Sequence, residues 1–406
     1  MNVGKSKEAN FSPWQIIAIN DYDSPMDFQA NVLEKPWVSL KKIIKREAKS
    51  DITVAETELR ELPHVQLANL VPDIDWALPA DALQSLANEN NDIPKFLVCQ
   101  PFCEHAKILT HWAKANQIQL IQPPDISQVL TADKEWLSSL PTEQKKPWVL
   151  PDLERCFLRH TQGLELLRRF LELAHSGLMG PGIIGCDSWA FAFIKKIWPL
   201  PDSSPLTLQA FDGHALEAYF TLIKQMNVKN NATQLLSTKT GRPLLPYPED
   251  ISTGKSTEFS EKKPALILPE LRQLAAHCRG NPGLAWHYWR KKLRSSTDGY
   301  QQTDASSKTG KEIVWVLPNI EEPSLPTDAT EDVAFLIHAL LIHRGLSTDL
   351  LCHMLPISRS RIISQLARMK TQCLVICKEN TWSIAPLAYP LIRDFLNERH
   401  YLVDPF

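Results

Sequence analysis

The sequence predicts an α/β protein in which helices cover a parallel sheet, followed by a smaller C-terminal unit of helices and a hairpin. Between residues 94 and 228, short apolar runs alternate five times with amphipathic stretches. Repeats of a strand and a helix at this length are typical of a parallel sheet with helices on both faces. Residues 330–406 instead carry several helical segments before one pair of short strands.

The α/β unit is expected to span residues 91–228. Its strands are expected at 96–99, 118–121, 148–150, 182–186 and 206–209. Its helices are expected at 106–116, from 127 onward, at 153–175, at 188–197 and at 214–226. Each helix follows a strand directly, so every crossover is short and the strands can lie parallel.

The other segments before the C-terminal unit are assigned from their composition. The expected pieces are a partly irregular N-terminal extension (1–90), a polar loop insertion (229–263), a helical lid (264–295) and a linker (296–329). The insertion is rich in Pro, Ser and Thr, which favours a loop. Residues 296–311 contain almost no side chain that could pack, which is typical of a linker.

The C-terminal unit reads as a winged helix. Residues 332–343 have helical periodicity, and Ser347 and Ser358 are expected to cap two further helices. A hairpin is expected at 373–384, and Pro386 starts a last helix. Three helices and a hairpin in this order describe a winged helix.

Composition excludes several classes of protein. The chain has 406 residues and a net charge of −2, so it has no overall attraction to nucleic acid or anionic lipid. No apolar run is long enough for a membrane span, and the first residues lack the apolar core of a signal peptide. We therefore expect a cytoplasmic protein whose eight scattered cysteines are mostly small buried hydrophobes rather than disulfides.

Two strand ends carry the residues on which the function depends. The strand at 148–150 ends in Asp152 and Glu154, and the strand at 182–186 ends in Asp187 and Ser188. With the corner at 99–106 and the lid turn Arg-Gly-Asn-Pro-Gly, these elements of residues 94–295 resemble the AAA+ and STAND groups of P-loop nucleoside triphosphatases (NTPases). In many members of these groups a winged helix follows the lid.

The resemblance implies roles for these strand ends in an active relative. Asp152 would organise magnesium and Glu154 would polarise the attacking water. Asp187 or Ser188 would match the polar sensor residue. The alternative interpretation is that Asp152 caps the helix that follows and Glu154 favours its positive end.

The phosphate-binding loop departs from the family pattern. Such a loop needs glycines to turn backbone amides inward, a lysine for the terminal phosphates and a Ser or Thr for magnesium. The sequence places Cys99 and Glu104 at the glycine positions, His105 at the lysine position and Ala106 at the hydroxyl position. Lys107 comes one residue late, although it could reach back. We therefore expect no cofactor, with Mg-ATP binding kept as the alternative, and we regard these residues as vestigial.

A metal centre is not expected from the sequence. Cys99, Cys103 and His105 lie close together, but zinc needs four ligands at finger-like spacing and no second pair follows. Asp152 and Glu154 are assigned no catalytic function once the phosphate loop is lost.

The helix at 358–370 is the candidate contact for DNA or for a partner protein. It carries Arg359, Arg361, Arg368 and Lys370. In DNA-binding winged helices such a helix enters the major groove, whereas in AAA+ and STAND proteins the domain often packs or relays. The sequence therefore favours a non-catalytic scaffold or regulatory adaptor that binds partner proteins. The alternatives are a weak ATP-dependent switch and a DNA-binding regulator.

Overall fold

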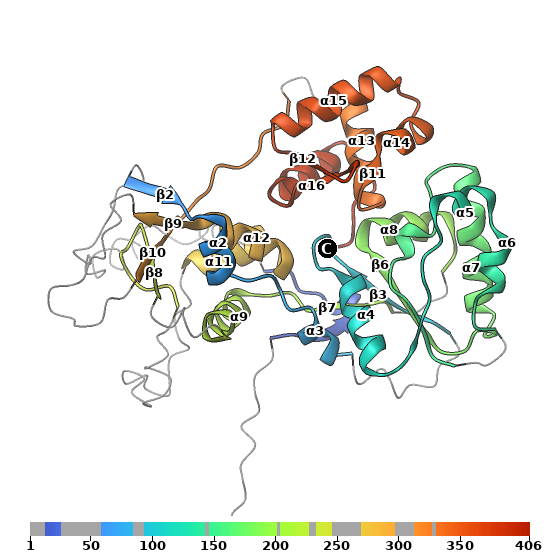
Figure 1. Ribbon diagram of the computed structural model, residues 1–406, viewed down its shortest axis with the longest axis horizontal. Coiled ribbons are helices and arrows are strands. Elements are labelled where there is room, and N and C mark those ends of the chain that lie inside the picture. Colours follow the sequence, from blue (N-terminus) through green and yellow to red (C-terminus); the bar gives the residue numbers. More distant parts are fainter. Residues whose placement is uncertain are drawn as a thin grey trace, which may run out of the picture.

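A computed structural model shows two sheets, the helices around them and a C-terminal unit (Figure 1). The structure describes residues 13–25, 58–83, 93–142, 146–200, 204–226, 233–245, 269–296, 312–326 and 330–406. In this part of the chain, no helix combines the length and the apolar character that crossing a membrane requires.

The main sheet has six strands in the order β1-β7-β3-β6-β5-β4. They are β1 (Ile16–Ala18), β3 (Lys95–Cys99), β4 (Gln119–Leu120), β5 (Trp148–Leu150), β6 (Gly182–Asp187) and β7 (Leu206–Leu208). The last five are parallel, and all five were expected from the sequence. The antiparallel edge strand β1 comes from the N-terminal extension and was not expected.

The helices of this unit mostly follow the expected pattern, with one correction. They are α4 (His105–Ala115), α5 (Ile126–Thr131), α6 (Lys134–Ser138), α7 (Glu165–His175), α8 (Ser188–Ile197) and α9 (Gly213–Met226). The prediction of one helix over 153–175 is wrong: two 3-10 turns, η5 (Leu153–Arg155) and η6 (Gln162–Leu164), precede α7. Cys156, Phe157 and Leu158, between the first turn and the second, are all buried.

A second sheet joins segments that the sequence did not connect. Its order is β2-β9-β10-β8, with β2 (Leu59–Glu61), β8 (Thr233–Ser237), β9 (Leu293–Ser296) and β10 (Glu312–Val316). Strand β8 lies within the expected loop 229–263, and β10 lies within the expected linker 296–329. Residues 297–311, on which the linker prediction depended most, lie outside the described residues.

Among the described residues, four further α-helices lie outside the two sheets and the C-terminal unit. They are α2 (His64–Leu70), α3 (Ala77–Asp81), α11 (Pro269–His277) and α12 (Pro282–Lys292). The turn between α11 and α12 comes very close to the corner after β3. A Cβ atom on Gly283 would lie 2.0 Å from the carbonyl oxygen of Phe102, so only glycine allows this approach. Asn281 caps α12 and also donates to the Pro101 carbonyl at 2.8 Å.

The C-terminal unit, residues 330–406, forms a body beside the carboxyl edge of the main sheet, with α15 on its outer side (Figure 1). It contains α13 (Glu331–Ile342), β11 (Leu346–Ser347), α14 (Thr348–Met354), α15 (Arg359–Thr371), β12 (Val375–Lys378), β13 (Thr381–Ile384), η8 (Pro386–Ala388) and α16 (Tyr389–Glu398). Its three strands form an antiparallel sheet in the order β11-β13-β12. Helix α13 is buried along most of its length, since it lies between α8 and its own unit.

Candidate functional site

The candidate site lies where β3, β6 and β5 end side by side. These strands are adjacent and parallel, so their carboxyl ends meet at one edge of the sheet. In open α/β sheets, this edge is where ligands bind. It brings together the corner that ends at His105, the acids after β5 and Asp187 at the end of β6.

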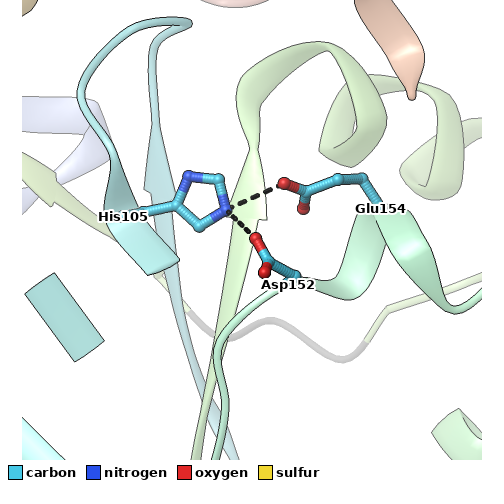
Figure 2. Close-up of side chains that lie close together, drawn as sticks. All are labelled: His105, Asp152 and Glu154. Carbon is cyan, nitrogen blue, oxygen red and sulfur yellow. Dashed lines mark ion pairs between the residues drawn. The ribbon is translucent and has the colours of Figure 1, made fainter. Parts of the chain in front are cut away.

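His105 is the first residue of α4 and points at both acids that follow β5 (Figure 2). Its Nε2 lies 3.0 Å from Glu154 Oε1 and 3.7 Å from Asp152 Oδ1, and only 1% of the side chain is exposed. Burial disfavours the charged ring, but the interactions with Glu154 and Asp152 together outweigh it and raise the pKa of His105. The Nε2 atom lacks a well-directed hydrogen bond, so the contact with Glu154 is an ion pair.

Glu154 and Asp187 are both almost fully buried. Burial alone would raise the pKa of the Glu154 carboxyl, but His105 and then Arg344 lower it to about 2. The backbone N–H of Asp187 also donates to Glu154 Oε2 at 3.3 Å. Glu154 is therefore held as an anion by two cations and one amide.

The pKa values of Asp152 and Asp187 are shifted in the opposite direction from the pKa of Glu154. Burial and the nearby charge of Glu154 raise the pKa of both carboxyls, in the case of Asp187 to about 7. The alternative prediction that Asp152 caps the following helix is wrong, since its side chain makes no cap hydrogen bond and faces His105 and Arg344. Asp187 is the residue that caps, because it accepts from the Trp189 N–H at 3.0 Å.

The cation that completes the site comes from the C-terminal unit. Arg344 follows α13, and its Nη1 lies 3.2 Å from Glu154 Oε1 and 3.3 Å from Asp152 Oδ1. Its Nη2 lies 3.4 Å from Glu104 Oε1. We call Glu104, Asp152 and Glu154 the acid cluster. Arg344 was not expected from the sequence, because an arginine before a glycine at a helix end is an ordinary terminating pattern.

Both Glu104 and Arg344 have left-handed backbone conformations. Their φ angles are 46° and 53°. Such angles typically cost about 1–3 kcal/mol for a residue with a side chain, and they concentrate at functional sites. The ion pair between them therefore joins two turns that the surrounding fold holds in unfavourable geometry.

A second buried contact joins the C-terminal unit to the main sheet. Asp404, whose side chain is fully buried, pairs with Arg393 Nε at 3.0 Å. Its Oδ2 accepts from Ser188 Oγ at 2.7 Å and from the Tyr389 hydroxyl at 3.0 Å. Ser188 therefore serves the interface between the two parts rather than the acid cluster.

A third contact is formed by two buried histidines of α13 and its C-terminal end. The Arg159 backbone N–H donates to His343 Nε2 at 3.2 Å, and Arg159 Nη1 lies 3.1 Å from His338 Nδ1. Burial, followed for His338 by the charge of Arg159, lowers the pKa of both histidines to about 4. Both imidazoles are neutral at physiological pH, so they do not repel the positive charge of Arg159.

The other residues at the phosphate-loop positions have packing or surface roles. Cys99 is buried at the end of β3, and Cys103 Sγ lies 3.3 Å from Asn281 Oδ1. Burial raises the pKa of the Cys103 thiol to about 12, so it is not a reactive thiolate. Lys107 is largely exposed and pairs with Glu104 at 3.4 Å, on the outer side of the cluster. Ala106 supplies no polar atom.

Helix α15, which carries the predicted basic residues, lies on the outer side of the C-terminal unit (Figure 1). Arg359 pairs with Asp349 at 2.6 Å, and Arg361 pairs with Asp332. Lys370 is exposed and Arg368 is half-buried. The neighbouring Ile363 is one of the exposed large hydrophobic residues of the described chain.

The side chains at this edge differ from those that hold magnesium and phosphates in a P-loop NTPase. Ala106 cannot ligate a metal, Glu104 would face the phosphates with a like charge, and Arg344 contacts the oxygens that would organise magnesium. Among the described residues, one group has donor atoms close enough for a metal: His105, Asp152 and Glu154, all within 4.8 Å of one another. Neither Cys99 nor Cys103 belongs to this set.

Comparisons with known proteins identify no family for this chain. No family model matches the chain, and no curated protein matches it. A solved structure, the Walker-type ATPase PABY2304 of Pyrococcus abyssi, aligns over 79% of this chain and 96% of its own, with 13% identity and a TM-score of 0.30. That TM-score is too low to support an argument from likeness. The parallel-rich central sheet of this chain is consistent with a P-loop NTPase-like fold.

Proposed function

We propose that this chain is a pseudo-ATPase: a non-catalytic scaffold or regulatory adaptor, related to AAA+ and STAND proteins, that binds partner proteins. One observation carries the proposal: Arg344 and His105 supply the positive charge that magnesium and a phosphate-loop lysine would supply in an active relative. Arg344 Nη1 lies within 3.3 Å of both acids after β5. The acids are thereby neutralised by the chain itself and need no nucleotide.

The energetics support this interpretation. Removing one partner of a buried ion pair typically costs about 3–5 kcal/mol, because the remaining charge stays desolvated. A nucleotide would have to displace Arg344 from Glu154 and would then face Glu104 without a lysine. Nucleotide binding at this edge would therefore cost electrostatic stabilisation that the remaining groups, without a lysine, do not return.

The C-terminal unit fits the same proposal. We infer that it is a winged helix, since a helix, a short strand, two further helices and a hairpin follow one another in that order. Its Arg344 and Asp404 contacts hold it against the carboxyl edge of the main sheet. The outer helix α15 is left to contact a partner, and exposed Ile363 lies among its basic residues.

We predict that the purified protein does not turn over ATP. Phosphate release by the native protein should equal that of Glu154→Gln, because neither has a lysine, a glycine turn or a magnesium hydroxyl ligand at 99–106. Turnover above background that the substitution abolishes would contradict the pseudo-ATPase proposal. It would favour the alternative of a weak ATP-dependent switch.

We also predict weak binding to duplex DNA, no tighter than about micromolar and without sequence preference. Arg359 and Arg361 already pair with Asp349 and Asp332, which reduces the charge that α15 can offer to phosphates. A variant with Arg359, Arg361 and Arg368 replaced by alanine should change protein association more than DNA association. Nanomolar, sequence-selective binding that this variant loses would instead establish a DNA-binding regulator. Its affinity would then fall by about 0.9 log units per tenfold salt for each phosphate contact.

A further inference from the structure

We propose that His105, Asp152 and Glu154 form a latent site for one divalent transition-metal ion, which Arg344 and the ion occupy in turn. The ion would be one that accepts one imidazole and two carboxylates, such as Zn²⁺, Co²⁺ or Mn²⁺. This goes beyond the proposed function, because it concerns a metal bound directly by three side chains without any nucleotide.

The donor atoms are already gathered. The His105 Nε2 and the two carboxylate oxygens lie within 4.8 Å of one another, and Nε2 is 3.0 Å from Glu154 Oε1. Metal–ligand distances of about 2.0–2.2 Å need donors a few ångströms apart, so small side-chain rotations suffice. Imidazole and carboxylate ligands together suit this class of ion.

His105 supplies an independent indication of a ligand. Its Nε2 is buried, points at both carboxylates and makes no well-directed hydrogen bond. A metal ion would take the Nε2 lone pair, which requires the neutral ring with its proton on Nδ1, and it would contact Nε2 and both carboxylates at once.

Arg344 and the ion exclude each other. Arg344 Nη1 contacts Asp152 Oδ1 and Glu154 Oε1, the same oxygens that lie nearest to His105. About a quarter of the Arg344 side chain is exposed, 27%, so the site opens to solvent on the side from which the arginine enters. An ion that takes the oxygens must release Arg344, which loosens the C-terminal unit.

The experiment uses the full-length protein and Co²⁺ as the probe, followed by calorimetry and visible absorption in the absence of nucleotide. Arg344→Ala should bind one Co²⁺ with an affinity at least about tenfold above that of the native protein, a difference of about 1.4 kcal/mol or more. Adding His105→Ala to this variant should return the affinity to the native level. Lys107→Ala, which removes a nearby cation that touches only Glu104, should leave the native affinity unchanged.

Equal Co²⁺ affinity in the native protein and Arg344→Ala would overturn the proposal, as would tight binding that survives loss of His105. Arg344→Met retains most of the aliphatic stem and replaces Arg344→Ala if the alanine variant does not fold.

In the native protein, saturating Co²⁺ should speed amide exchange at Arg159, whose N–H donates to His343 across the interface. If saturating Co²⁺ leaves amide exchange at Arg159 unchanged, metal binding is not coupled to the interface with the C-terminal unit. ATP turnover is not measured in these experiments, so they and the test of the proposed function fail independently.

Discussion

Replacing Glu154 with alanine is expected to lower the free energy of unfolding by about 3–5 kcal/mol, the usual effect of removing one member of a buried ion pair. The carboxylate is 1% exposed and is the common partner of His105 and Arg344. Without it, the imidazole and the guanidinium lie close together with only Asp152 and Glu104 to balance them. The substitution should therefore also weaken the contact between the C-terminal unit and the main sheet.

Urea denaturation followed by tryptophan fluorescence measures this effect. Glu165→Ala is the matched control: its carboxylate lies 2.9 Å from Arg169 on the surface of α7 and is 41% exposed. Exposed pairs of this kind typically contribute about 0–1 kcal/mol. If the two variants lose the same stability, the acid cluster does not hold the fold together.

The dependence on pH identifies the same carboxylate. Because the pKa of Glu154 falls to about 2 on folding, from an ordinary value of 4.5, the unfolded chain binds more protons between these values. The stabilisation from Glu154 is therefore complete above pH 4.5 and is lost as the pH falls toward 2. Glu154→Ala should lack this contribution, so its stability difference from the native protein should shrink across this acid range.

Asp404→Ala is the second large effect that we expect, again about 3–5 kcal/mol. The Asp404 side chain is 0% exposed, and its loss would leave the Arg393 guanidinium, 10% exposed, without its 3.0 Å partner. It would also remove the acceptor for Ser188 Oγ at the start of α8, one of the contacts between the two parts of the chain. The C-terminal unit should therefore undock more easily.

Trp189 reports this change directly. Its indole N–H donates to the Tyr389 hydroxyl, which donates in turn to Asp404. We expect a red-shifted Trp189 emission in Asp404→Ala. The contribution of Trp189 is obtained by subtracting the emission of the same protein that also carries Trp189→Phe. Asp394→Ala is the control, since that carboxylate is 64% exposed and 3.6 Å from Arg279, and it should shift neither emission nor stability appreciably. A native-like emission and stability in Asp404→Ala would show that this contact does not hold the interface.

The sequence alone determined the local elements of the fold and the candidate acids. The strands at 96–99, 148–150 and 182–186 are short apolar runs between polar corners, and that signal depends only on neighbouring residues. The sequence also singled out His105 in the corner after one strand and Asp152 and Glu154 after another. The departure of residues 99–106 from a phosphate loop could likewise be read from residue types alone.

Only the tertiary structure decided what fills the site and what holds the C-terminal unit. Arg344 is 192 residues from Asp152, and Asp404 is 216 residues from Ser188, so no local pattern connects them. The second sheet has the same origin, since β10 pairs with β8 across about eighty residues. Periodicity and capping act over a few residues, whereas a buried charge acquires its partner only after distant segments have packed.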